Sequence, residues 1–127
     1  MSTPRILLCD DDKNMRDWLR VLLRPIGATL VEATSGWQLL HLLAEKGPFD
    51  LVVTDVRMPM PSGIHVVTMA RAAGLTTPFL VITAFPDDLV RDTVAAVPDT
   101  ELLGKPFEGD ELVQAVERML EPAAVAL

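Results

Sequence analysis

The sequence contains no tyrosine, and aromatic residues of any kind make up only 5% of its 127 residues. Its one cysteine, Cys9, ends the apolar run 6–9, so a disulfide framework is excluded and a buried, unreactive thiol is predicted. The only two histidines, His41 and His65, lie on segments of helical spacing, where we predict ordinary surface or boundary positions. Without a cluster of histidines and cysteines, the sequence offers no typical zinc site.

Basic residues are also scarce, because Lys and Arg total 11 against 18 Asp and Glu, which leaves a net charge of −7. Such a surface repels phosphate backbones, so we expect no direct contact with nucleic acid. Long hydrophobic runs are missing as well. The run 6–9 near the first residue is too short for a signal peptide or a membrane span, so we expect a cytoplasmic protein.

The chain has the length of one domain, and half of its residues are hydrophobic, which fits a globular protein with one core. Short apolar segments of strand length alternate with longer segments of helical spacing. The predicted strands are 5–9, 28–32, 51–54, 79–83 and, more weakly, 101–103. The predicted helices are 15–23, a segment after Ser35 that carries Leu39, Leu40 and Leu43, and then 64–73, 89–97 and 109–120.

This alternation predicts an α/β fold, because parallel strands need crossover connections and these are nearly always right-handed helices. Segments 5–9, 51–54 and 79–83 are apolar throughout and should be central, whereas 28–32 alternates and should be an edge strand. We predict a five-stranded parallel sheet in the order 2-1-3-4-5 with helices on both faces. This is a doubly wound, flavodoxin-like (βα)5 domain over residues 1–121, with a short tail, 122–127.

Polar side chains stand where four of the predicted strands end: Asp10 and Asp11, Asp55, Thr83, and Lys105. In doubly wound sheets, ligands bind beyond the carboxyl ends of the strands, at the point where the strand order reverses. Two carboxylates about 4 Å apart repel each other by roughly 4 kcal/mol at an effective dielectric near 20, so the cluster requires a cation. Oxygen ligands at a partly open edge favour Mg²⁺.

A carboxylate beside Mg²⁺, a hydroxyl and an ammonium suits phosphoryl transfer, whose product here would be an acyl phosphate. Lys105 would hold the phosphate as a mobile point charge, and the Thr83 hydroxyl would gain an acceptor only once phosphate is present. Asp12 is expected to cap the following helix or to be exposed. The acidic run therefore predicts a metal-dependent phosphoryl acceptor.

Four motifs occur in order at these strand ends: Asp10-Asp11, Asp55-Val-Arg-Met-Pro-Met-Pro-Ser-Gly, Thr83-Ala84 and Lys105-Pro106-Phe107. Through them, nearly the whole chain resembles the receiver domains of two-component response regulators. The resemblance implies that Asp55 accepts a phosphoryl group from a phosphohistidine of a sensor histidine kinase or a histidine phosphotransfer protein. It also implies a signalling domain that catalyses its own phosphorylation and dephosphorylation, not an enzyme that turns over an external substrate.

By the same resemblance, Mg²⁺ would be bound, directly or through water, by Asp10, Asp11, Asp55 and the backbone carbonyl of Arg57. Lys105 and Thr83 would engage the phosphate, and the Lys105–Pro106 peptide bond would be cis. Arg57 and Phe85 occupy positions that in this family modulate the loss of phosphate to water.

The resemblance further implies an output through protein contacts, either with a downstream target or with an output domain that is missing here, in a monomer or weak dimer. The face formed by helix 109–120 and the adjoining strand and helix is the expected contact surface. One departure bears on switching, because Leu102 stands where receivers carry a Tyr or Phe. Leucine has no ring to rotate, so the signal would instead pass through 84–88 and the next helix, or the domain would only shuttle phosphate.

Two alternatives remain open at this point. In a haloacid-dehalogenase-type phosphatase, Asp10 would be the nucleophile and Asp12 the acid. In a receiver-like adaptor, the same fold would dock partners without accepting phosphate. A nucleotide-binding function is not supported, because Gly104-Lys105 is followed by proline and lacks a glycine-rich loop.

Overall fold

The computed structural model describes residues 3–120, and within that range five strands alternate with five α-helices. The strands are β1 Arg5–Cys9, β2 Thr29–Ala33, β3 Leu51–Asp55, β4 Phe79–Thr83 and β5 Thr100–Gly104. The helices are α1 Lys13–Leu23, α2 Gly36–Lys46, α3 Gly63–Ala72, α4 Asp88–Ala96 and α5 Gly109–Met119. All strand pairs are parallel and the order is β2-β1-β3-β4-β5, which confirms the predicted fold.

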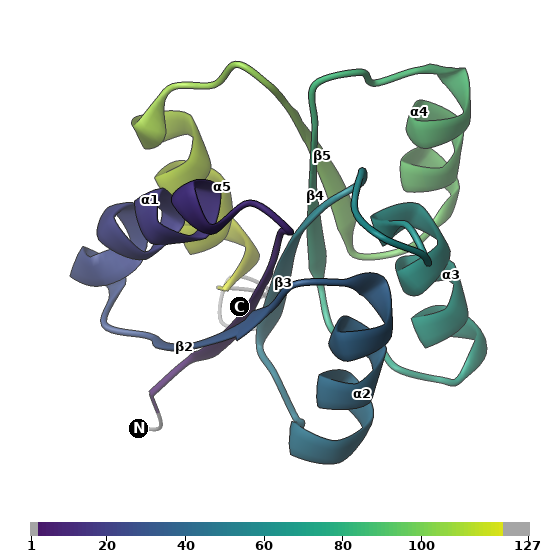
Figure 1. The fold of residues 1–127 in the computed structure, drawn as a ribbon, viewed down its shortest axis with the longest axis horizontal. Coiled ribbons are helices and arrows are strands. Elements are labelled where there is room, and N and C mark those ends of the chain that lie inside the picture. The colour runs from purple at the N-terminus through teal and green to yellow at the C-terminus, as the bar shows by residue number, and fades with distance from the viewer. Residues whose placement is uncertain (1–2, 121–127) are drawn as a thin grey trace, which may run out of the picture.

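The sheet is covered on both faces. Helices α1 and α5 lie on one face, and α2, α3 and α4 lie on the other (Figure 1). Strands β3 and β4 are fully buried and β1 nearly so, while β2 and β5 at the edges are mostly half-buried, as the apolar patterns predicted.

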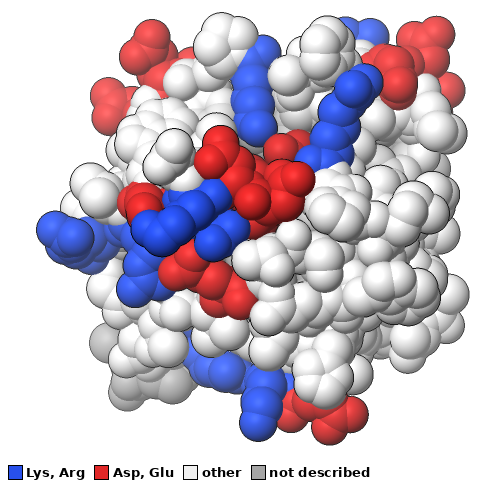
Figure 2. Space-filling view, viewed as in Figure 1, with Lys and Arg blue, Asp and Glu red and all other residues white. Residues whose placement is uncertain are grey.

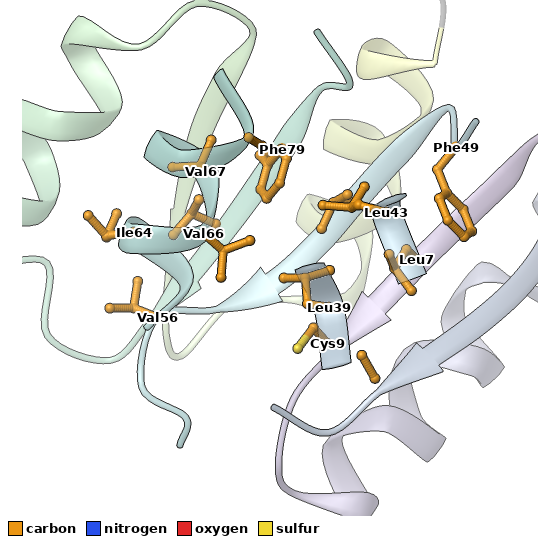
Figure 3. Packing of buried hydrophobic residues seen from close by; sticks show 14 of the residues in the cluster. Leu7, Cys9, Leu39, Leu43, Phe49, Val56, Ile64, Val66, Val67 and Phe79 are labelled. Atoms are coloured by element: carbon orange, nitrogen blue, oxygen red, sulfur yellow. The ribbon is translucent and has the colours of Figure 1, made fainter. Parts of the chain in front are cut away.

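Side chains of one strand alternate between the two faces, so the core forms two clusters. On β1, Ile6 and Leu8 join the cluster under α1 and α5, whereas Leu7 and Cys9 join the cluster under α2 and α3. Figure 3 shows this second cluster, in which Cys9 lies close to Leu39 of α2.

Most α-helices begin after a residue whose side chain caps the first turn, and for α1 this is Asp12, as predicted. Asp12 precedes α1, and its Oδ1 accepts a hydrogen bond from the backbone N–H of Asn14 at 2.9 Å. Ser35 caps α2 in the same way, through the N–H of Gln38. A short 3-10 helix, Arg24–Ile26, links α1 to β2 and was not predicted.

The register of the sheet places the strand ends side by side. Cys9 of β1 is paired with Thr54 of β3, and Asp55 is paired with Ile82 of β4. Thr83 at the end of β4 is paired with Gly104 of β5. The residues that end or follow these four strands therefore lie at one edge, which is where the sequence placed its polar cluster.

Cys9 and both histidines lie where the sequence placed them. Cys9 is buried, and burial raises the pKa of its thiol to about 12, so the thiol stays protonated as predicted. His41 and His65 are exposed, also as predicted. No helix within residues 3–120 is long and apolar enough to cross a membrane. The predicted tail, 122–127, lies outside the described residues.

Gly36 provides a test of the packing between α2 and the loop before α3. A Cβ atom at Gly36 would overlap the backbone carbonyl of Pro61, whereas a Cβ at Gly104 would meet nothing within 4 Å. We expect Gly36→Ala to lower the free energy of unfolding by about 1–3 kcal/mol. The control Gly104→Ala should change it by less than about 0.5 kcal/mol. Urea denaturation measures both, and equal effects of the two variants would contradict this description of the packing.

Candidate functional site

Asp55, the last residue of β3, lies at the centre of the polar cluster. Its Oδ2 is 3.1 Å from the ammonium of Lys105, and its Oδ1 accepts a hydrogen bond from the backbone N–H of Arg57 at 3.1 Å. Lys105 is itself anchored, because its backbone N–H donates to the carbonyl of Thr83 at 2.7 Å. Three of the predicted site residues are thus joined by direct contacts across β3, β4 and the end of β5.

Asp10, which follows β1, is only 3% exposed. Burial raises the pKa of its carboxyl group from the usual 3.8 to about 6, and the negative charges of Asp55 and Asp11 contribute to this rise. A hydrogen bond from the Asp12 N–H at 2.9 Å and the charge of Lys105 act in the opposite direction. Asp10 and Asp55 therefore lie close enough to repel each other, as the sequence predicted.

The other two acids of the run point to solvent. Asp11 is exposed, and the exposed carboxylate of Asp12 is used to cap α1. Figure 2 shows acidic side chains gathered near the middle of the view, close to where β1 ends in Figure 1, with basic side chains beside them. Because Asp10 is buried and Asp12 serves as a helix cap, the pair does not have the geometry of an open nucleophile and acid. The phosphatase alternative thus loses its main support.

The charges at the site do not balance. Two buried carboxylates, Asp10 and Asp55, face one ammonium, that of Lys105, and Asp10 forms no ion pair with the described part of the chain. No group of three or more His, Cys, Asp or Glu side chains within residues 3–120 is arranged to hold a metal ion. Mg²⁺ nevertheless needs only one or two carboxylate ligands from a protein, because it usually keeps several water ligands. The excess negative charge and the oxygen donors fit that ion.

Phe85 contacts both Thr83 and Arg57. Thr83 is fully buried, and its hydroxyl oxygen accepts a hydrogen bond from the Phe85 N–H at 3.1 Å, which leaves the hydroxyl proton to donate elsewhere. The guanidinium of Arg57 lies over the Phe85 ring, 4.6 Å from its centroid. These two residues, singled out in the sequence, are therefore in contact with each other.

The segment after β5 agrees with one prediction and adds a feature that was missed. The Lys105–Pro106 peptide bond is cis, as the resemblance implied. Phe107 stacks on Trp18 of α1, with ring centroids 5.3 Å apart, beside a mostly apolar hollow of about 360 Å³ that Lys105 also lines. Trp18 lies within the helix predicted over 15–23, and the sequence assigned it no further role. Its contact with the lysine-bearing segment joins residues far apart in sequence, and no local pattern indicates it.

Comparison with known proteins gives a consistent result. The family model described as response regulator receiver domain matches residues 6–117. The chain is 38% identical over 117 residues to the response regulator protein PmrA of Pseudomonas aeruginosa, and 33% identical over 116 residues to the response regulator receiver protein CpdR of Brucella abortus. Both alignments cover 91% of this chain. They cover 52% of PmrA and 96% of CpdR, so the chain spans about half the length of the first of these relatives.

Among solved structures, the receiver domain of the Francisella response regulator 1452 superimposes with a TM-score of 0.84 at 26% sequence identity. That comparison covers 94% of this chain and 98% of the Francisella chain. The likeness thus extends over nearly the whole sheet and its helices.

The raised pKa of Asp10 leads to a prediction about stability. The folded protein binds the proton of the Asp10 carboxyl group more tightly than the unfolded chain does. The contribution of this group to the free energy of unfolding is therefore fully present below about pH 4 and is lost as the pH rises past about 6. In Mg²⁺-free buffer at about pH 8, we expect Asp10→Asn to be more stable than the parent by about 1–3 kcal/mol. Near pH 4 the difference should nearly vanish.

Urea denaturation at the two pH values measures this difference. The matched control is Asp11→Asn, which removes a charge from the exposed neighbour and leaves the buried Asp10 carboxyl group in place. A loss of stability of the same size at both pH values in Asp10→Asn would contradict the assigned repulsion.

Proposed function

The chain belongs to the family of response regulator receiver domains, and on that premise we propose that Asp55 accepts a phosphoryl group from a phosphohistidine of a partner protein. Receivers of this family act as phosphoacceptors in two-component signalling and are not, in general, enzymes that turn over a substrate. One observation carries the assignment to Asp55. Its nearly buried carboxylate is held between the Lys105 ammonium and the Arg57 N–H, beside the uncompensated charge of Asp10.

The contacts of Asp55 suggest how the transfer proceeds. A lone pair of an Asp55 carboxylate oxygen attacks phosphorus as the nitrogen–phosphorus bond of phosphohistidine breaks, and the bonding pair returns to the imidazole. The new oxygen–phosphorus bond removes the charge of the carboxylate. The ammonium of Lys105 then finds a better acceptor in a phosphoryl oxygen, and the Thr83 hydroxyl can donate to a second one.

We assign the divalent site to Asp10, Asp11, Asp55 and the backbone carbonyl of Arg57, acting directly or through water. The support is the excess negative charge of Asp10 and Asp55, and the position of the Arg57 backbone, which already contacts Asp55. Bound Mg²⁺ would supply neutralisation of charge on the phosphoryl oxygens. The carboxylates would then be held together by attraction to the ion.

A sensor histidine kinase or a histidine phosphotransfer protein is the proposed donor. The proposed recipient of the signal is a downstream protein or an output domain of a longer protein, reached through the face made of α4, β5 and α5. Leu102 of β5 is half-buried against the core cluster under α2 and α3, so it fills space there without a ring that could rotate. The absence of nucleic-acid contact, the cytoplasmic location, the monomeric or weakly dimeric state and the boundary at residue 121 stay predictions.

The proposed acceptor can be tested with a small phosphodonor. Incubation with acetyl phosphate and Mg²⁺ should add one phosphoryl group, detected by intact-protein mass spectrometry. Asp55→Asn should abolish this addition, because it removes the nucleophilic carboxylate while keeping the size of the side chain. Asp12→Asn is the matched control, since it removes a charge from the same acidic cluster and retains a good helix cap. This control should be phosphorylated like the parent.

Two results would contradict the proposal in different ways. Phosphate found on Asp10 in the Asp55→Asn variant would restore the phosphatase alternative. No Mg²⁺-dependent addition from any small donor would favour the adaptor, in which the receiver fold only docks partners.

A further inference from the structure

Arg16 of α1 connects the edge strand β2 to the acidic site. Its Nε donates to Oε1 of Glu32 on β2 at 2.9 Å, and one terminal nitrogen donates to the backbone carbonyl of Asp10 at 2.8 Å. The Arg16 side chain is only 13% exposed, so this is not an ordinary surface ion pair. A planar guanidinium suits this place, because it presents several N–H donors in a fixed fork.

The contact matters because of where the Asp10 carbonyl lies. The peptide group between Asp10 and Asp11 is planar, and its N–H points in the direction opposite to its carbonyl. A contact that fixes the Asp10 carbonyl therefore also fixes the Asp11 N–H. Asp10 is held at two further points, since its own N–H donates to the carbonyl of Ala33 at 3.2 Å and its Oδ1 accepts from Asp12. Arg16 therefore holds the peptide from which two of the proposed ligands of the divalent ion extend.

We propose that Arg16 is a positioning residue for the divalent cation, which it never touches: it orients the Asp10–Asp11 peptide and so sets the direction of both carboxylates. This inference rests on the proposed function, because it concerns the same metal site. A cation so near a cation site would by itself weaken binding, and Glu32, which Arg16 shares with Arg20, offsets only part of that charge. The positioning role therefore has to outweigh the remaining repulsion.

Arg20, one turn further along α1, provides the comparison within the same chain. It binds the other oxygen of Glu32 at 2.8 Å, but its side chain is 45% exposed. Its side-chain contact is to Glu32 and not to Asp10. Removing either arginine deletes one positive charge and one contact between α1 and β2. Only the removal of Arg16 also frees the Asp10 carbonyl.

The two explanations of Arg16 predict opposite signs. If Arg16 acted only through its charge, Arg16→Ala would bind a divalent ion more tightly, because a nearby positive charge is gone. If it acts by positioning, the same variant binds the ion more weakly, since the ligands lose their fixed orientation.

The experiment is a titration of the whole chain with Mn²⁺, in which electron paramagnetic resonance counts the free ion and competition with Mg²⁺ confirms the site. For Arg16→Ala we expect the dissociation constant to rise by about tenfold. Arg20→Ala should leave it unchanged or lower it slightly. Arg16→Lys should lie between the parent and Arg16→Ala, because one ammonium cannot span both acceptors in the same geometry. Thermal melts without metal identify any variant that is not folded.

The outcomes separate this inference from the proposed function. A parent protein that binds no Mn²⁺ would remove the proposed metal site itself. A parent that binds, together with an Arg16→Ala variant that binds equally well or more tightly, would overturn the positioning role alone. If Arg16→Ala does not fold, Mn²⁺ binding by Arg16→Lys is compared with Mn²⁺ binding by Arg20→Lys. Binding that is weaker in Arg16→Lys but not in Arg20→Lys supports the positioning role. Equal binding by the two variants overturns it.

Discussion

Asp10 and Asp55 end up together because β1 and β3 are neighbouring parallel strands, not because their side chains attract. Backbone hydrogen bonds and the burial of both strands determine the register. This register in turn fixes the positions of the two carboxylates. The energetic cost of this arrangement appears in the raised pKa of Asp10. Burial and the negative charge of Asp55 both disfavour the ionised form of the Asp10 carboxyl group. A covered parallel sheet thus holds negative charge in place, and a divalent cation can relieve the resulting repulsion.

The surrounding structure determines the orientation of these acids. Lys105 approaches Asp55 from the end of β5, and the stack of Phe107 on Trp18 ties the lysine-bearing segment to α1. The same helix carries Arg16, which holds the Asp10 carbonyl. Helix α1 therefore contacts both sides of the site, through an aromatic pair on one side and a guanidinium on the other.

The predictable parts of this protein are those that local pattern determines. Continuous apolar runs indicate β1, β3 and β4, and the ends of the same runs place Asp55 and Thr83 at strand ends. Asp12 could be assigned as a cap from its place before a helical stripe. The role of Arg16 could not be found in this way, because its contacts depend on how β2 registers against β1 and brings Glu32 beneath α1. The 3-10 helix Arg24–Ile26 escaped prediction because so short a segment has no periodicity.

Titration of the Asp10 carboxyl group by nuclear magnetic resonance, with and without Mg²⁺, tests directly whether the site holds uncompensated negative charge. In metal-free protein we expect a midpoint near pH 6, because burial and neighbouring charges disfavour the ionised form. Addition of Mg²⁺ should move that midpoint well down, since the ion favours the carboxylate. A midpoint at the ordinary value of 3.8 that does not respond to Mg²⁺ would show that the repulsion does not exist.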